Sequence, residues 1–239
     1  MNQLKPSSAL KADAREILLG KYKTVVLAYL LMQLITSSIL TFIELQVNVQ
    51  TTTGLLLYYA VSFIVAILST VFVVGQNHLY LNIYRCQPFE TGNIWIGFKT
   101  CADRAILAYL LIAAKIVLSA VPCILATAIM LTTQNYYFAL IVGGCAIFWI
   151  ISSALIELDY SQVFYLILDH PDMSVTALLS ESKALMKGHR GSYLYLMVSF
   201  IGIQLLSALT FGIGMFWAYP YITATKTGYY LELKKRNTD

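Results

Sequence analysis

Residues 193–233 read YLYLMVSFIGIQLLSALTFGIGMFWAYPYITATKTGYYLEL, an apolar stretch interrupted in its middle by Thr210-Phe211-Gly212-Ile213-Gly214. About 20 apolar residues are enough for one helical crossing of a bilayer. The stretch therefore holds either one span, which leaves the chain end on the far side, or two spans joined by a turn at 210–214. The rest of the chain has to decide between these alternatives.

The composition indicates an integral membrane protein. Hydrophobic residues make up 59% of the 239 residues and charged residues only 12%, whereas a soluble domain carries about 25% charged residues. No basic run interleaved with aromatic residues lies outside the apolar segments, so we expect no nucleic-acid partner. The sequence predicts one membrane domain over residues 1–239, with lipids as its surroundings.

Four further apolar segments precede the C-terminal stretch. Each is long enough to cross a bilayer as a helix. The expected spans cover residues 24–43, 55–75, 105–131 and 136–155. Only residues 132–135 separate the last two, which predicts a tight helical hairpin.

The distribution of Lys and Arg decides the number of spans. Cytoplasmic segments of membrane proteins are enriched in these residues. With six spans, the three outer loops contain neither Lys nor Arg, and a five-span chain would place Lys234, Lys235 and Arg236 outside. The sequence therefore predicts an all-α bundle of about six spans over residues 24–233, a cytoplasmic lead-in at 1–23 and a cytoplasmic tail at 234–239. The cytoplasmic segments then hold Lys5, Lys11, Arg15, Lys21, Lys23, Arg85, Lys99, Arg104, Lys183, Lys187, Arg190, Lys234, Lys235 and Arg236.

Two segments outside the spans have amphipathic helical spacing. In residues 6–20 the apolar Leu10, Ala14 and Leu18 share one face, and residues 174–187 show the same pattern. Such helices are typical of the membrane surface. We expect both to lie on the cytoplasmic face, although the first could also be a polar lead-in continuous with the first span.

The C-terminal third carries a set of short motifs. They are Ser182-Lys183-Ala184-Leu185-Met186-Lys187-Gly188, Ser199-Phe200-Ile201-Gly202, Gly212-Ile213-Gly214, Trp217-Ala218-Tyr219-Pro220-Tyr221 and Tyr229-Tyr230-Leu231-Glu232-Leu233. Together with the lead-in at 10–31, they resemble a family of bacterial membrane proteins known as domain of unknown function 975. The chain departs from that family at Ser152-Ser153-Ala154, where members often carry a Pro-Gly pair. The resemblance implies a Gram-positive bacterial source, and it implies no activity and no catalytic residue.

Lys115 is the most unusual charged residue within the expected spans. It lies about ten residues into the third span, and a cation near mid-membrane costs at least about 2.5 kcal/mol on insertion scales. Such a residue is often part of a ligand or proton site, and Glu157 and Asp159 on the next helix are the candidate partners. The alternative is a lysine that reaches the interface from a helix that begins deeper in the membrane.

Two residues of the last span are further candidates. Pro220 is expected to break the helix, and broken helices often line binding sites in transporters. Lys226 lies toward the cytoplasmic end of the same span, where it could also simply reach the interface. Outside the spans, Lys183, Lys187 and Arg190 are placed to contact anionic lipid headgroups.

No pattern predicts a cofactor or a metal. The histidines show no HExxH spacing and the four cysteines form no CxxC pair. The sequence therefore favours a non-catalytic protein of the plasma membrane that works through lipids or through another membrane protein or transporter, as an accessory or immunity component. The alternatives are a small permease built around Lys115 and Pro220 and, third, an enzyme that acts on lipid headgroups.

Overall fold

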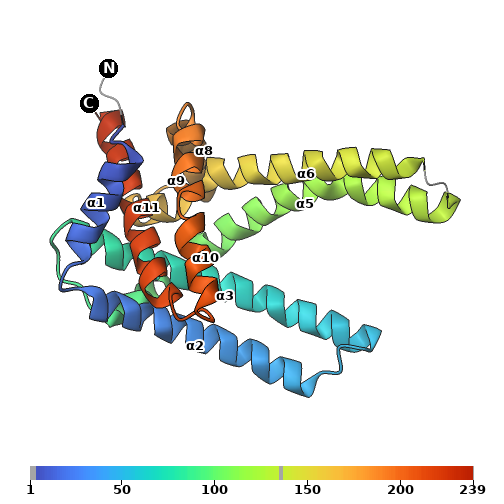
Figure 1. Ribbon diagram of the computed structural model, residues 1–239, viewed down its shortest axis with the longest axis horizontal. Coiled ribbons are helices and arrows are strands. Elements are labelled where there is room, and N and C mark those ends of the chain that lie inside the picture. The colour runs from blue at the N-terminus through green and yellow to red at the C-terminus, as the bar shows by residue number, and fades with distance from the viewer. Residues whose placement is uncertain (1–3, 135–136, 239) are drawn as a thin grey trace.

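The computed structural model describes residues 4–134 and 137–238, and every regular element in these residues is a helix (Figure 1). The all-α prediction is therefore confirmed for this part of the chain. The elements are α1 (Ser7–Leu18), α2 (Tyr22–Gln46), α3 (Thr52–Tyr84), the 3-10 helix η1 (Thr91–Trp95), α4 (Ile96–Thr100), α5 (Ala102–Thr133), α6 (Phe138–Tyr160), α7 (Val163–Asp169), α8 (Val175–Met186), α9 (Arg190–Val198), α10 (Ile201–Leu209) and α11 (Met215–Thr238).

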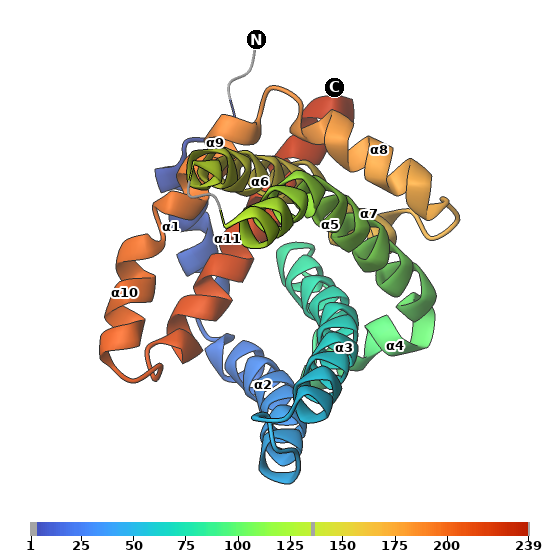
Figure 2. The ribbon, with the colours of Figure 1, turned by 90° about the vertical axis from the view of Figure 1, so that its right-hand side faces the viewer.

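Two long hairpins, α2–α3 and α5–α6, extend from one end of the molecule and diverge from each other (Figures 1 and 2). The Thr51 hydroxyl accepts a hydrogen bond of 3.1 Å from the Gly54 amide and caps α3 at the first tip. At the second tip Gln134 adopts the left-handed conformation, with φ of 49°, and ends α5. Helix α5 ends at Thr133 and α6 begins at Phe138, so the connection is short as predicted but lies one to two residues later than 132–135, and its residues 135–136 lie outside the described part.

Helices α9, α10 and α11 form a third, shorter hairpin. The chain reverses at residues 210–214, where Phe211 and Gly212 have φ values of 53° and 85°. Glycine adopts a positive φ at little cost, which explains its place in this turn. The reversal returns the C-terminus to the side of α1, so both chain ends lie together (Figure 1). We call this end of the molecule the base.

Within residues 4–134 and 137–238, five helical segments are long and apolar enough to cross a membrane. They are Tyr22–Gln46, Thr52–Tyr84, Ala102–Thr133, Phe138–Asp169 and Arg190–Leu209. Helix α11 is not among them, because polar residues such as Thr223, Thr225 and Lys226 lower its hydropathy. The chain therefore has a multi-pass membrane architecture with five such segments, followed by a helix that runs back toward the base.

The two amphipathic helices occur where the sequence predicts them, but their apolar faces contact protein. Leu10, Ala14 and Leu18 of α1 are at most 3% exposed, and Leu178 and Met186 of α8 are fully buried. Helix α1 packs against α11, and α8 packs against the inner ends of α5, α6 and α7. These faces are occupied by other helices and leave little apolar surface for the membrane. Sequence periodicity shows that a helix is amphipathic, but not what covers its apolar face.

The polar stretch after the second span is more ordered than the sequence suggests. Helix α3 continues to Tyr84, and residues 91–100 then fold back along it as η1 and α4. The backbones meet so closely that a Cβ atom on Gly75 would lie 2.0 Å from the Ile94 carbonyl oxygen, and one on Gly97 would lie 2.3 Å from that of Val71. This contact thickens the base and places the start of α5 beside α3.

Candidate functional site at the base of the bundle

The base is held together by ionised side chains from distant parts of the chain. The carboxylate of Asp169, at the end of α7, is 4% exposed. It accepts hydrogen bonds from Arg85 at 2.7 Å, from Lys234 at 2.6 Å and from the Tyr230 hydroxyl at 2.7 Å. Bonds between ionised groups are about twice as strong as neutral ones. Asp169 therefore joins α7 to the end of α3 and to α11.

A second ion pair joins α6 to α9. Arg190 donates two hydrogen bonds to the Asp159 carboxylate, at 2.5 and 2.9 Å. The Ser182 hydroxyl of α8 donates to the backbone carbonyl of Asp159 at 2.7 Å. The bidentate geometry is the one that Arg and a carboxylate prefer. Arg190 therefore has a protein partner, which differs from the lipid contact predicted for it.

Lys115 lies at the inner end of the α5–α6 hairpin. Its ammonium group donates to the Tyr160 hydroxyl at 2.5 Å and lies 4.2 Å from the centroid of that ring. At 1.5 Å per residue, Lys115 is about 27 Å along α5 from Thr133, which is close to the thickness of a hydrocarbon core. The structure thus brings Lys115 to Tyr160, and not to Glu157 or Asp159. This position agrees with the alternative in which the lysine reaches the interface.

The two candidates on α11 lie within one continuous helix. Helix α11 runs from Met215 to Thr238 through Pro220, so the break expected at the proline is wrong. The turn at 210–214 is where the chain reverses. Among the described residues Lys226 has no ion-pair or hydrogen-bond partner, and it is partly buried.

The remaining candidates are solvent-exposed or isolated. Lys183 on α8 and Lys187, directly after its end, are exposed and remain available to headgroups. His170 lies 3.9 Å from Glu181. Within residues 4–134 and 137–238, no three His, Cys, Asp or Glu side chains form a group that could hold a metal ion.

Asp169 is the central residue that sequence reasoning missed. It follows Tyr165 by one helical turn on the apolar face of 156–170, and Tyr165 is itself 4% exposed. Carboxylates are rarely buried without a partner. An aspartate on the apolar face of an amphipathic segment was therefore the available signal, although its partners, 61 to 84 residues away, could not be identified from the sequence.

Comparison with known proteins identifies a family but no function. A family model described as protein of unknown function (DUF975) matches residues 1–237. No match was found among curated proteins or among solved structures. Because the family model covers nearly the whole chain, this protein belongs to the DUF975 family of proteins of unknown function.

Proposed function

We propose that this chain is a non-catalytic protein of the bacterial plasma membrane that crosses it six times, with both termini in the cytoplasm. In this proposal it acts through lipids or through a partner membrane protein, as an accessory or immunity component. The observation that carries the proposal is that exposed apolar surface and ion pairs lie in different parts of the molecule. Large apolar side chains are exposed along α2, α3, α5, α6, α9 and α10, while the ion pairs gather at the base.

The α5–α6 hairpin offers the surface for a partner. In the apolar part of α6 no residue is buried, and in that of α5 only 11% are buried. Leu140 is 86% exposed and Phe148 56% exposed. Beyond its inner end the hairpin packs mainly against itself, so its outer faces contact whatever surrounds it in the membrane.

Six crossings predict a definite labelling pattern. In a chain with its native cysteines replaced by serine, a single cysteine at Asn48, Gln134 or Ile213 should react with an impermeant maleimide in intact cells. A cysteine at Asn237 should react only after the membrane is opened. The reason is that α11 returns the tail to the base, where Lys and Arg are concentrated. Labelling of Asn237 in intact cells would support five crossings instead.

Photo-crosslinking in cells tests whether a partner exists. A photoreactive residue at Leu140 or Phe148 should give a discrete protein adduct, because both side chains face away from the bundle. The same residue at Ala218, which is 1% exposed, should give none and serves as the buried control. Adducts with lipid alone, together with a clean monomer from mild detergent, would contradict a protein partner.

A permease is the second candidate, and one observation favours it. Gln76 is 2% exposed, and its amide oxygen accepts a hydrogen bond of 2.7 Å from Tyr219, next to Pro220. Its amide nitrogen has no partner among the described residues. Buried donors are almost always bonded, so a polar substrate could satisfy this one. Uptake that is lost in Gln76→Leu, with folding unchanged, would favour the permease over the partner protein.

A further inference from the structure

Lys226 is a cation in the middle of α11 that has no partner in the described part of the chain. Its ammonium group forms no hydrogen bond, ion pair or ring contact there, and it retains accessible surface. Residues 222–225 and 227–230 are all buried, whereas Lys226 is only partly buried. Buried charges in proteins are normally paired. The side chain therefore reaches an opening that its neighbours do not, and we expect it to meet an anion that is not part of the chain.

Lys226 projects between the helices that its neighbours contact. On one side the Tyr230 hydroxyl donates to Asp169 at the end of α7, at 2.7 Å. On the other side the ring of Tyr229 lies 5.0 Å from that of Tyr193 in α9, measured between centroids. An α-helix turns by about 100° per residue, so Lys226 points about 40° from Tyr230 and about 60° from Tyr229, on the side between them. The opening therefore lies between α7 and α9.

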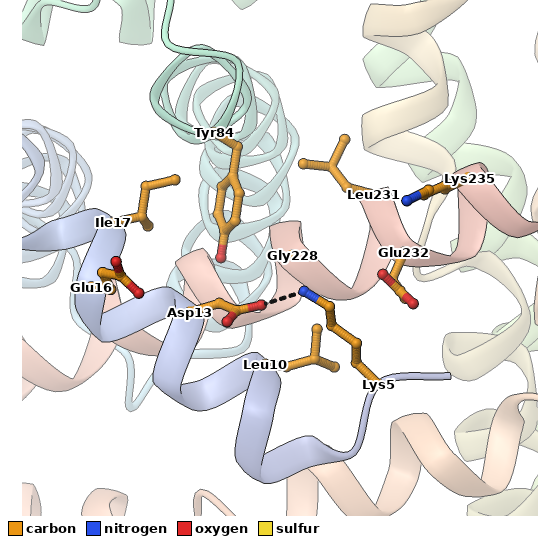
Figure 3. A pocket seen from close by; sticks show the side chains of 10 residues that line it. All are labelled: Lys5, Leu10, Asp13, Glu16, Ile17, Tyr84, Gly228, Leu231, Glu232 and Lys235. Atoms are coloured by element: carbon orange, nitrogen blue, oxygen red, sulfur yellow. Dashed lines mark hydrogen bonds and ion pairs between the residues drawn. The ribbon is translucent and has the colours of Figure 1, made fainter. Parts of the chain in front are cut away.

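The opposite side of α11 packs against protein (Figure 3). A Cβ atom on Gly228 would lie 2.8 Å from the Tyr84 hydroxyl oxygen, so α11 and the end of α3 meet closely there. The neighbouring cavity of about 470 Å³ is lined in part by Glu16 of α1 and Glu232 of α11. Gly228 lies about 200° around the helix from Lys226. This close contact fixes the rotation of α11 and directs Lys226 away from α1 and the end of α3.

Lys226 lies at the depth expected for lipid headgroups. The Tyr229 hydroxyl donates to the His189 carbonyl at 3.1 Å, and His189 directly precedes the apolar segment Arg190–Leu209. Lys226 is three residues further from the base than Tyr229, which is about 4.5 Å along the helix. The headgroup layer on each side of a bilayer is about 5–8 Å thick. In a membrane that contains the six proposed spans, Lys226 is therefore within reach of lipid phosphates.

We propose that the Lys226 ammonium binds the phosphate of an anionic phospholipid, which enters between α7 and α9. Ammonium and phosphate groups form charge-assisted hydrogen bonds, and lysine is a common phosphate ligand. Tyr219 and Met215 are partly exposed and lie within about 20° of Lys226 around α11, two and three turns further from the base. They offer apolar surface to an acyl chain, which a soluble anion lacks. The inference rests on the proposed function, because α11 has to lie in the membrane, and it names the class of lipid.

Binding is tested with the full-length protein in a neutral detergent, by thermal unfolding with increasing phosphatidylglycerol. We expect a saturable rise in Tm, from which an apparent Kd follows. Lys226→Met should raise this Kd at least about fivefold, because it removes the charge that contacts the phosphate. Lys226→Arg keeps the charge and should change the Kd by less than about twofold. Lys99→Met removes an exposed lysine of α4 and should leave the Kd unchanged.

The lipid-free protein separates binding from a structural role of Lys226. Methionine has a similar length and needs no partner, so Lys226→Met should unfold at the same temperature as the unchanged protein or at a higher one. Only the rise in Tm that phosphatidylglycerol causes should be reduced. A lower Tm of Lys226→Met without lipid would assign the lysine to the fold and would contradict the proposal.

Three further outcomes would overturn it. The first is equal affinity of Lys226→Met and the unchanged protein for phosphatidylglycerol. The second is an equal rise in Tm with diacylglycerol of the same chains, which would show that the headgroup is not recognised. The third is a Lys226-dependent rise in Tm with glycerol phosphate alone, which would assign the site to a soluble phosphate. Failure of the proposed function is seen separately, because labelling of a cysteine at Asn237 in intact cells contradicts six spans whatever the lipid result.

Discussion

Replacing Asp169 by Asn should destabilise the protein more than any other single loss of charge at the base. The substitution keeps the shape of the side chain but leaves Arg85 and Lys234 without the anion that neutralises both. Breaking a buried ion pair by removing one partner costs about 3–5 kcal/mol. The Arg85 and Lys234 side chains are each 37% exposed, so they stay partly hydrated and we expect the lower end, about 3 kcal/mol.

The effect of Asp169→Asn is measured by thermal unfolding of the purified protein in detergent. For a chain of this size, about 3 kcal/mol corresponds to a fall in Tm of roughly 6–12 °C. Asp172→Asn is the matched control, because Asp172 is exposed three residues further along the chain. It should change Tm by less than about 2 °C, since surface substitutions are usually worth within 0.5 kcal/mol. Equal changes in the two variants would show that Asp169 does not hold α3, α7 and α11 together.

Gly75→Ala should release the segment that folds back along α3. The new methyl group would lie 2.0 Å from the Ile94 carbonyl oxygen, and that oxygen belongs to the backbone and cannot rotate away. Overpacking costs typically about 1–3 kcal/mol, and more when the backbone has to move. We expect a loss of about 3 kcal/mol and a partial detachment of residues 91–100 from α3.

The thiol of Cys101 reports this detachment directly. Cys101 follows α4 and is 3% exposed, so it should react slowly with maleimide when it is the only cysteine left. In Gly75→Ala its labelling rate should rise at least about tenfold, which corresponds to a decrease of about 1.4 kcal/mol in the free energy of local opening. Gly143→Ala adds the same methyl group to a helical glycine with open space around it. It should leave both the Tm and the labelling rate unchanged. If Cys101 is labelled as slowly in Gly75→Ala as in the unchanged protein, the close packing of Gly75 against Ile94 is disproved.

The helical hairpins could be predicted because their signals are local. The α5–α6 connection is short because two apolar segments nearly adjoin, and Gly212 and Gly214 mark the turn at 210–214 once the distribution of Lys and Arg has favoured two spans. Helices α1 and α8 were predicted within a few residues of their observed bounds. Apolar period and turn residues are properties of neighbouring positions, so one chain segment is enough to show them.

The candidate site was predicted only in part, because its contacts are distant in sequence. Lys115 is conspicuous as a charge in an apolar segment, but its bond to Tyr160 depends on the relative shift of two helices. Asp159 was named as a partner for Lys115 and instead binds Arg190. The helix pairing, and not the residue type, decides which oppositely charged groups meet.

The sequence by itself determined that this chain is a helical membrane protein and that 193–233 turns back on itself. The first conclusion rests on the cost of placing polar groups in a bilayer, and the second rests on the distribution of Lys and Arg along the whole chain. Only the tertiary structure decided that α1 and α8 pack on protein, that Asp169 joins three helices, and that Tyr84, Gly228 and two glutamates surround one cavity. These features arise where α11 returns to the base beside α1. Helix α11 contains the C-terminal half of residues 193–233. Its polar residues lower its hydropathy and make it a weak candidate for a membrane span, because the helix also forms part of the base.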